Sequence, residues 1–165
     1  MADYLVVIVN RATARFLTLE PVEFPEYESG PRLIPCGELA NAEFKVDARD
    51  LFADSKTGRG SAPGGGPVHG FDDKRNQHAI HSTRKFGAEV MVRVIRMTER
   101  NKTRNIILAA SARMRSLLFP EAERLARQGY RIVTLSKNMT NFSTPKIHQY
   151  LAQAELIPSQ GFVTA

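Results

Sequence analysis

Residues 53–75 constrain the fold most, because six glycines and two prolines fall within this one segment. Glycine weakens helices and strands, and proline removes a backbone donor, so this composition predicts a flexible loop rather than a helix or a central strand. Loops longer than about 12–15 residues are uncommon in compact domains and are usually functional or disordered. The segment is therefore the first candidate for a functional site.

Hydrophobic patterns before this loop predict three strands. Residues 4–10 form a nearly continuous aliphatic run, typical of a strand that is covered on both faces. Residues 14–20 alternate loosely after a turn at residues 10–13, which favours an antiparallel second strand. Prolines then break the acidic connection at residues 21–35, and a short third strand is predicted at residues 38–46.

Helical and strand patterns alternate after the loop. We expect helix, strand, two successive helices, strand and helix, with the ranges 76–101, 105–110, 111–119, 120–128, 131–135 and 145–156. Ser111 and Ser143 are candidate helix caps, and Gly129 occupies the position that usually follows a helix end. Strands that alternate with helices imply parallel pairing. The sequence therefore predicts a single α/β domain with a mixed β-sheet flanked by helices.

The helix predicted at residues 76–101 has an apolar stripe and a basic remainder. Apolar residues recur at spacings of three and four, whereas the basic residues fall largely off that stripe; they are Arg84, Lys85, Arg93, Arg96 and Arg100. We expect such a helix to bury one face on the sheet and to present a cationic face to solvent.

Positive charge is concentrated in the middle of the chain. Residues 1–55 hold 5 Lys/Arg and 10 Asp/Glu, residues 56–115 hold 13 and 4, and residues 116–165 hold 5 and 3. Residues 56–115 therefore carry a net charge of +9, although the whole chain carries a net charge of only +6. Clustered cations indicate a phosphate-binding surface, and a solvated helix face is the alternative.

The composition favours a cytoplasmic protein. Cys36 is the only cysteine, so no intrachain disulfide is possible, and we expect a buried structural thiol in a reducing compartment. The first residues predict a strand rather than a signal peptide. No apolar run approaches the roughly 18 residues of a membrane span, so we expect no membrane partner.

Several chemistries are disfavoured by spacing. No Gly-Lys-Ser/Thr follows the glycines at residues 64–66, and they lack the dinucleotide-binding pattern. His78 and His81 are three residues apart, close enough to share a metal, and His69 precedes them, but no cysteine accompanies the three. Histidines near a cationic surface also serve as phosphate partners. We expect no metal and no cofactor.

Two further sets of residues leave alternatives open. The aspartates around the loop make a two-metal nuclease conceivable, but their spacing is irregular; they are Asp47, Asp50, Asp54, Asp72 and Asp73. Ser111 lacks a nucleophile-elbow motif, so a helix cap is preferred for it. Arg113 and Arg115 follow a strand end, where they either contact a ligand phosphate or face solvent.

Three segments carry a resemblance to a known family. They are Asp-Leu-Phe-Ala-Asp-Ser-Lys-Thr-Gly-Arg at 50–59, Asn-Ile-Ile-Leu-Ala-Ala-Ser-Ala-Arg-Met-Arg-Ser-Leu-Leu at 105–118, and Leu-Ser-Lys-Asn-Met-Thr-Asn-Phe-Ser-Thr-Pro-Lys-Ile at 135–147. The chain resembles the bacterial host attachment family over nearly its whole length, most weakly at residues 21–45. That family is similar to the middle domain of archaeal and eukaryotic class 1 translation release factors. The resemblance implies a ribonuclease H-like α/β sheet and a site of action on the ribosome or on tRNA.

The resemblance also directs attention to the triglycine. Release factors carry Gly-Gly-Gln in the corresponding loop, which promotes hydrolysis of peptidyl-tRNA. Gly64, Gly65 and Gly66 supply a similar flexible backbone here, but Pro67 follows them and offers neither an amide side chain nor a backbone N–H. His69 is the remaining catalytic candidate in this segment.

The leading hypothesis is a cytosolic RNA- or ribosome-associated protein, whose basic glycine-rich loop contacts rRNA or tRNA. The predicted contacts are Arg59, Gly64, Gly65, Gly66, Lys74, Arg75, Arg84 and Lys85. A peptidyl-tRNA or ester hydrolase that acts through the loop is the first alternative. A non-enzymatic module linked to cell attachment, with an acidic protein as its partner, is the second.

Overall fold

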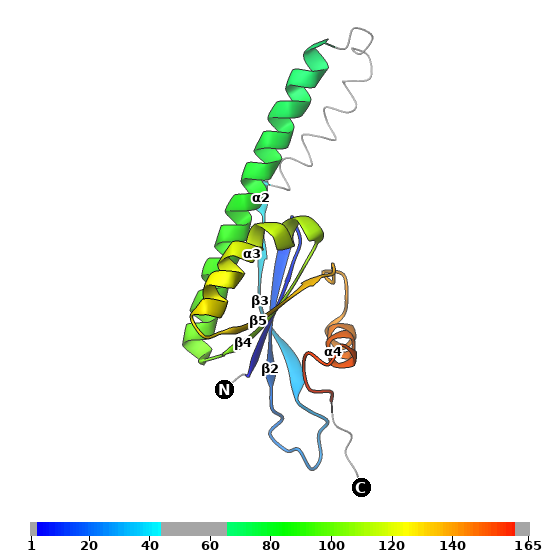
Figure 1. The fold of residues 1–165 in the computed structure, drawn as a ribbon. Coiled ribbons are helices and arrows are strands. Elements are labelled where there is room, and N and C mark those ends of the chain that lie inside the picture. The colour runs from blue at the N-terminus through cyan, green and yellow to red at the C-terminus, as the bar shows by residue number, and fades with distance from the viewer. Residues whose placement is uncertain (1–2, 44–65, 161–165) are drawn as a thin grey trace.

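The computed structural model describes residues 3–43 and 66–160, and for residues 66–76, His78 and Ala79 it describes the backbone only. The described residues form a single α/β domain around one five-stranded mixed sheet. Its elements, labelled as in Figure 1, are β1 Tyr4–Val9, β2 Thr13–Glu20, β3 Arg32–Ala40, α2 Gly66–Asn101, β4 Asn105–Ala110, α3 Ala112–Arg127, β5 Arg131–Ser136 and α4 Thr144–Gln153. The predicted fold class is thus confirmed at this level.

The sheet has the strand order β3-β2-β1-β4-β5. The first three strands form an antiparallel meander, whereas β1, β4 and β5 run parallel. The Asn10 side chain closes the β1–β2 turn, because its Oδ1 accepts hydrogen bonds from the backbone N–H groups of Ala12 (2.8 Å) and Thr13 (2.7 Å). Both halves of the predicted sheet are therefore present, the meander first and the parallel pairs second.

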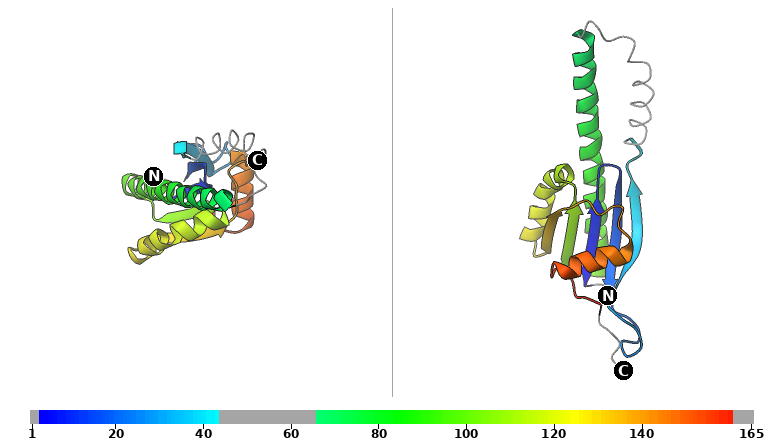
Figure 2. Two further views of the ribbon diagram at one scale, coloured as in Figure 1. Left: turned by 90° about the horizontal axis from the view of Figure 1, so that it is seen from above. Right: turned by 90° about the vertical axis from the view of Figure 1, so that its right-hand side faces the viewer.

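Helices cover both faces of the sheet. Helices α2 and α3 pack on one face and α4 on the other, as the right-hand view of Figure 2 shows. The first core contains Val7, Phe16 and Phe86, and the second contains Ile8, Leu17 and Ile147. Side chains of a strand point alternately to opposite faces, so β1 and β2 contribute to both cores. This burial explains the continuous aliphatic run of β1.

Strand β3 differs from its predicted position at residues 38–46, because it spans Arg32–Ala40 and includes Pro35. A proline breaks a central strand, but β3 is an edge strand, whose outer N–H groups need no partner in the sheet. Cys36 is the extra residue between the pairs Phe16–Gly37 and Leu17–Pro35, so the strand bulges there. The thiol is exposed, and the prediction of a buried Cys36 was wrong.

Helix α2 begins at Gly66, ten residues before the predicted start at Asn76. The last part of the predicted loop, residues 66–75, is therefore helical, and residues 53–65 lie outside the described residues. Pro67 stands in the first turn, where the helix leaves backbone N–H groups unpaired in any case, so proline costs little there. The prediction, which was based on the glycines and prolines, therefore placed the start of the helix too late.

Helix α3 is continuous from Ala112 to Arg127, although a break was predicted at Pro120. An interior proline costs about 3 kcal/mol, but Leu118, Ala122 and Leu125 on both sides of it are buried on one helix face. Their burial offsets that cost. Gly129 follows the helix with φ +100°, as its predicted place after a helix end requires.

Candidate nucleic-acid interface

The amino-terminal half of α2 projects past the sheet (Figures 1 and 2). Among the side chains described on this helix, Ser82 is the first that is buried, and Phe86, Val90 and Val94 then pack into the core. Gln77 and the residues up to 81 with described side chains are exposed. At 1.5 Å per residue, residues 66–81 span about 24 Å. We call this part of α2 the projecting half.

Seven of the nine predicted site residues lie on the projecting half or before it. Arg59, Gly64 and Gly65 lie outside the described residues, Gly66 begins the helix, and His69, Lys74 and Arg75 lie on its backbone-only part. The structure thus brings four of them onto one helix, where a loop had been predicted. A helix presents its side chains in a fixed angular order, which a loop does not.

Arg84 and Lys85 lie where α2 enters the body of the protein, and both are exposed. The Nζ atom of Lys85 donates a hydrogen bond to Oε1 of Glu43 at 3.0 Å, and this bond raises the pKa of Lys85. Arg84 instead lines an open cleft of about 300 Å³ between α2 and α3, together with Met91 and Glu121. The two cations therefore lie on different sides of the helix.

Further exposed cations continue along the Lys85 side of α2. A helix turns by about 100° per residue, which places Lys85, Arg96 and Arg100 within about 60° of one another. Arg96 and Arg100 are exposed. Arg93 lies on the same side but is partly buried, with its guanidinium carbon 5.8 Å from the centre of the Phe16 ring. Glu89 is exposed on this side as well and acts on Lys85, so the predicted cationic face is found here only in part.

The two arginines after β4 are both exposed. Arg115 Nε donates a hydrogen bond to Thr134 Oγ1 of β5 at 3.3 Å. Ser111 stands at the N-cap position of α3, but its side chain makes no capping bond, and its Oγ is buried without a hydrogen-bond partner among the described residues. The predicted cap is therefore right in position and wrong in its hydrogen bond.

A polar network that the sequence did not reveal joins the β1–β2 turn and β2 to the segment after β5. Asn10 Nδ2 donates to Thr140 Oγ1 at 3.0 Å, and Thr140 Oγ1 donates to Asn138 Oδ1 at 2.6 Å. Arg15 donates from one guanidinium nitrogen to the carbonyls of Thr140 (3.2 Å) and Phe142 (2.6 Å). Asn138, Thr140 and Phe142 belong to the segment at residues 135–147 that carried the family resemblance. That motif therefore has a structural task, because it fixes the approach to α4.

No cluster of three His, Cys, Asp or Glu side chains with metal-binding geometry occurs among the side chains that the structure describes. The side chains of His69, His78, Asp72 and Asp73 are not among them. The predicted nuclease alternative also depended on aspartates at 47, 50 and 54, which lie in the undescribed segment.

The fold and this interface define a class, an α/β domain of mixed sheet with one long projecting helix. A family model described as "protein required for attachment to host cells" matches residues 5–151. The chain belongs to this family, as the resemblance predicted. No curated protein matches the chain. Within residues 3–43 and 66–160, no helix is both long enough and apolar enough to cross a bilayer.

Proposed function

We propose that the protein is an RNA- or ribosome-associated cytosolic protein, which binds rRNA or tRNA through the projecting half of α2 and the basic segment before it. The observation that carries the proposal is the projection of α2 by about 24 Å beyond the core, whose described residues pack on its second half. A projecting element reaches phosphates in a groove that a flat surface cannot approach. The excess of positive charge in residues 56–115 supports the same partner.

The proposal extends to the release-factor likeness. The meander followed by parallel strands agrees with the ribonuclease H-like sheet that the resemblance implies. Gly64–Gly66 would then occupy the place of the release-factor loop, at the amino-terminal end of α2. In this arrangement the body stays outside the RNA and the helix carries the loop to it.

Binding is tested with labelled tRNA and with ribosomes sedimented at two salt concentrations. The variant Arg59→Glu/Lys74→Glu/Arg75→Glu should lose RNA binding while it keeps its circular dichroism spectrum. The matched control is Arg124→Glu/Arg127→Glu/Arg131→Glu, which reverses three exposed charges away from the projecting half. Each phosphate contact that is lost should reduce the salt slope by about 0.7–0.9 log units per log unit of salt. Equal losses in both variants would contradict a specific interface.

The hydrolase alternative requires turnover rather than binding alone. Pro67 removes the amide of the release-factor motif, so His69 and backbone groups would have to hold the attacking water. Incubation with purified peptidyl-tRNA should show release above buffer that His69→Ala abolishes. No release above buffer leaves RNA binding without catalysis.

The second alternative is a non-enzymatic module in cell attachment with an acidic protein partner, and the family description agrees with its cell-attachment part. Capture of partners from a lysate, with and without ribonuclease, separates it from the main proposal. Partners that persist after ribonuclease treatment and depend on the same cations favour the module. Partners that disappear favour RNA.

A further inference from the structure

The connection between β2 and β3 lies at the end of the sheet away from the projecting half of α2 (Figure 1). Together with Asp3, which precedes β1, this connection carries several acidic and aromatic side chains. We call this surface the acidic pole, and its members are Asp3, Glu23, Phe24, Glu26, Tyr27 and Glu28. Neither the core nor the proposed RNA interface uses it.

The acidic pole carries an excess of negative charge, although Arg32 lies beside it, with its Nε donating to the Ser29 carbonyl at 3.1 Å. Residues 16–31 contain four glutamates and no lysine or arginine. The carboxylates of Glu23, Glu26, Glu28 and Asp3 form no ion pair with any residue that the structure describes, whereas other surface glutamates do, among them Glu121 and Glu123. The pole therefore attracts cations and repels phosphate.

Two large aromatic side chains stand among these carboxylates. Phe24 is 54% exposed and Tyr27 is 79% exposed. Aromatic rings that face solvent beside carboxylates are suited to lysine and arginine, because a ring face attracts the cation while a carboxylate pairs with it. Aromatic residues are also enriched in protein interfaces.

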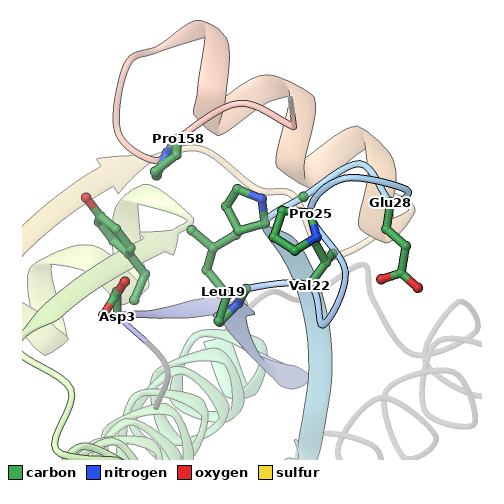
Figure 3. Close-up of a pocket in the computed structure, with 10 residues that line it drawn as sticks. Asp3, Leu19, Val22, Pro25, Glu28 and Pro158 are labelled. Carbon is green, nitrogen blue, oxygen red and sulfur yellow. The ribbon is translucent and has the colours of Figure 1, made fainter. Parts of the chain in front are cut away.

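A cavity of about 310 Å³ opens beside the connection. Its wall is mainly apolar, with Leu19, Val22 and Pro25 on one side and Pro158 across from them (Figure 3). Asp3 and Glu28 stand at its two ends in the same view, and Tyr4 and Pro31 complete the lining. An apolar hollow between two carboxylates suits a partner with apolar and cationic side chains in alternation.

The connection is folded before any partner arrives. The backbone N–H groups of Tyr27 and Glu28 both donate to the Phe24 carbonyl, at 3.0 and 2.9 Å. Gly30 packs so tightly on Val22 that a Cβ at that glycine would lie 2.5 Å from a Val22 methyl group. A preformed site pays less ordering entropy on binding than a disordered one.

We propose that the acidic pole binds a basic peptide segment of another protein. Lysine or arginine side chains of the partner pair with the pole's carboxylates and stack on Phe24 and Tyr27, while an apolar side chain enters the cavity. Complementary charge selects this occupant, because nucleic acid and anionic lipid both carry the wrong sign. The protein thus has two separate surfaces, and this inference does not depend on RNA binding at the other end.

The probes are two fluorescein-labelled peptides, Lys-Leu-Arg-Leu-Lys-Leu-Arg and the same peptide with glutamate in place of each lysine and arginine. Fluorescence anisotropy with the full chain should show binding of the basic peptide and none of the acidic one. Binding should weaken as salt rises from 0.05 to 0.5 M (about 14 to 4 Å of screening length), because the charges are exposed.

Two variants locate the site. Glu23→Gln/Glu26→Gln/Glu28→Gln should weaken binding by about tenfold, and Phe24→Ala/Tyr27→Ala should weaken it with the charge unchanged. The matched control Glu38→Gln/Glu99→Gln/Glu123→Gln removes the same charge from other exposed positions. Urea unfolding checks that every variant is folded. Equal weakening by the pole variant and the control would overturn the proposal.

A second copy of this chain is the competing occupant, since residues 56–115 are basic. Sedimentation velocity of the protein without peptide measures whether the chain self-associates. A monomer that binds the basic peptide supports the proposal. An oligomer that the charge variant of the pole dissociates would overturn it, because the occupant would then be the chain itself.

Discussion

Lys85 Nζ lies 3.0 Å from Glu43 Oε1, and this ion pair fastens α2 to the segment that follows β3. Both side chains are partly or largely exposed, so the pair acts in water and is screened by salt. The hydrogen bond from Lys85 to Glu43 is the largest cause of the raised pKa of Lys85.

Glu43→Gln should therefore lower the pKa of Lys85 toward its ordinary value. A raised lysine pKa stabilises the fold fully below the unfolded pKa of about 10.4, and that contribution is lost as pH rises through the folded pKa. Titration of the Lys85 side chain by carbon NMR measures the shift in both proteins. An unchanged titration in Glu43→Gln would contradict the role of the pair.

Two serines at helix starts should respond oppositely to alanine. Ser143 Oγ accepts a hydrogen bond from the Lys146 N–H at 3.3 Å, so Ser143→Ala should destabilise the protein by about 0.5–2 kcal/mol. Ser111 Oγ is buried without a partner, so Ser111→Ala should be neutral or stabilising. Urea unfolding compares the two variants under one condition. A large loss in Ser111→Ala would show that its hydroxyl has a partner.

The two halves of α2 should differ in their contribution to stability. Phe86 is 2% exposed within the core, and Phe86→Ala should cost about 3–5 kcal/mol. Ile80 is 49% exposed on the projecting half, and Ile80→Ala should change the free energy of unfolding by no more than about 0.5 kcal/mol. Chemical denaturation measures both. Comparable losses would mean that the projecting half is packed against something in solution.

Cys36 should react slowly with iodoacetamide at neutral pH. Although Cys36 is an exposed residue, partial desolvation of its thiol beside the bulge raises the pKa, Arg93 opposes that rise, and Glu20 adds to it. The pH midpoint of alkylation should lie above the value of about 8.5 for a free cysteine, and Arg93→Gln should raise it further. Arg96→Gln, at an exposed position on the same helix, is the control. A midpoint below that of free cysteine would contradict this assignment.

Strand β1 could be predicted from sequence because burial on both sheet faces leaves the continuous apolar run Leu5–Val9, and β2 could be predicted from its loose alternation after a turn. Strand β3 could not be placed correctly, because Pro35 reads as a break unless the strand is known to be at the edge. Pro120 likewise led to a predicted helix break that is absent, because buried neighbours on both sides of it stabilise a continuous α3. Local composition thus fails where tertiary position decides the cost of proline.

The candidate interface was predictable only in part. Charge clustering along the sequence identified the basic region, and helical periodicity identified the cationic side with Arg96 and Arg100. That Glu43 would pair with Lys85 depends on contacts between distant parts of the chain, which no local pattern records. The Asn10–Thr140 bond, across 130 positions, was invisible for the same reason.

Among the side chains that the structure describes, α2 packs into the core through its second half, and this has a geometric consequence. A single helix with its side chains is about 10–12 Å across, far narrower than a five-stranded sheet with helices on both faces. An opening too small to admit the domain still admits the helix tip. Under the proposed function, the width of the passage as well as its charge would therefore select the RNA sites that the tip can reach.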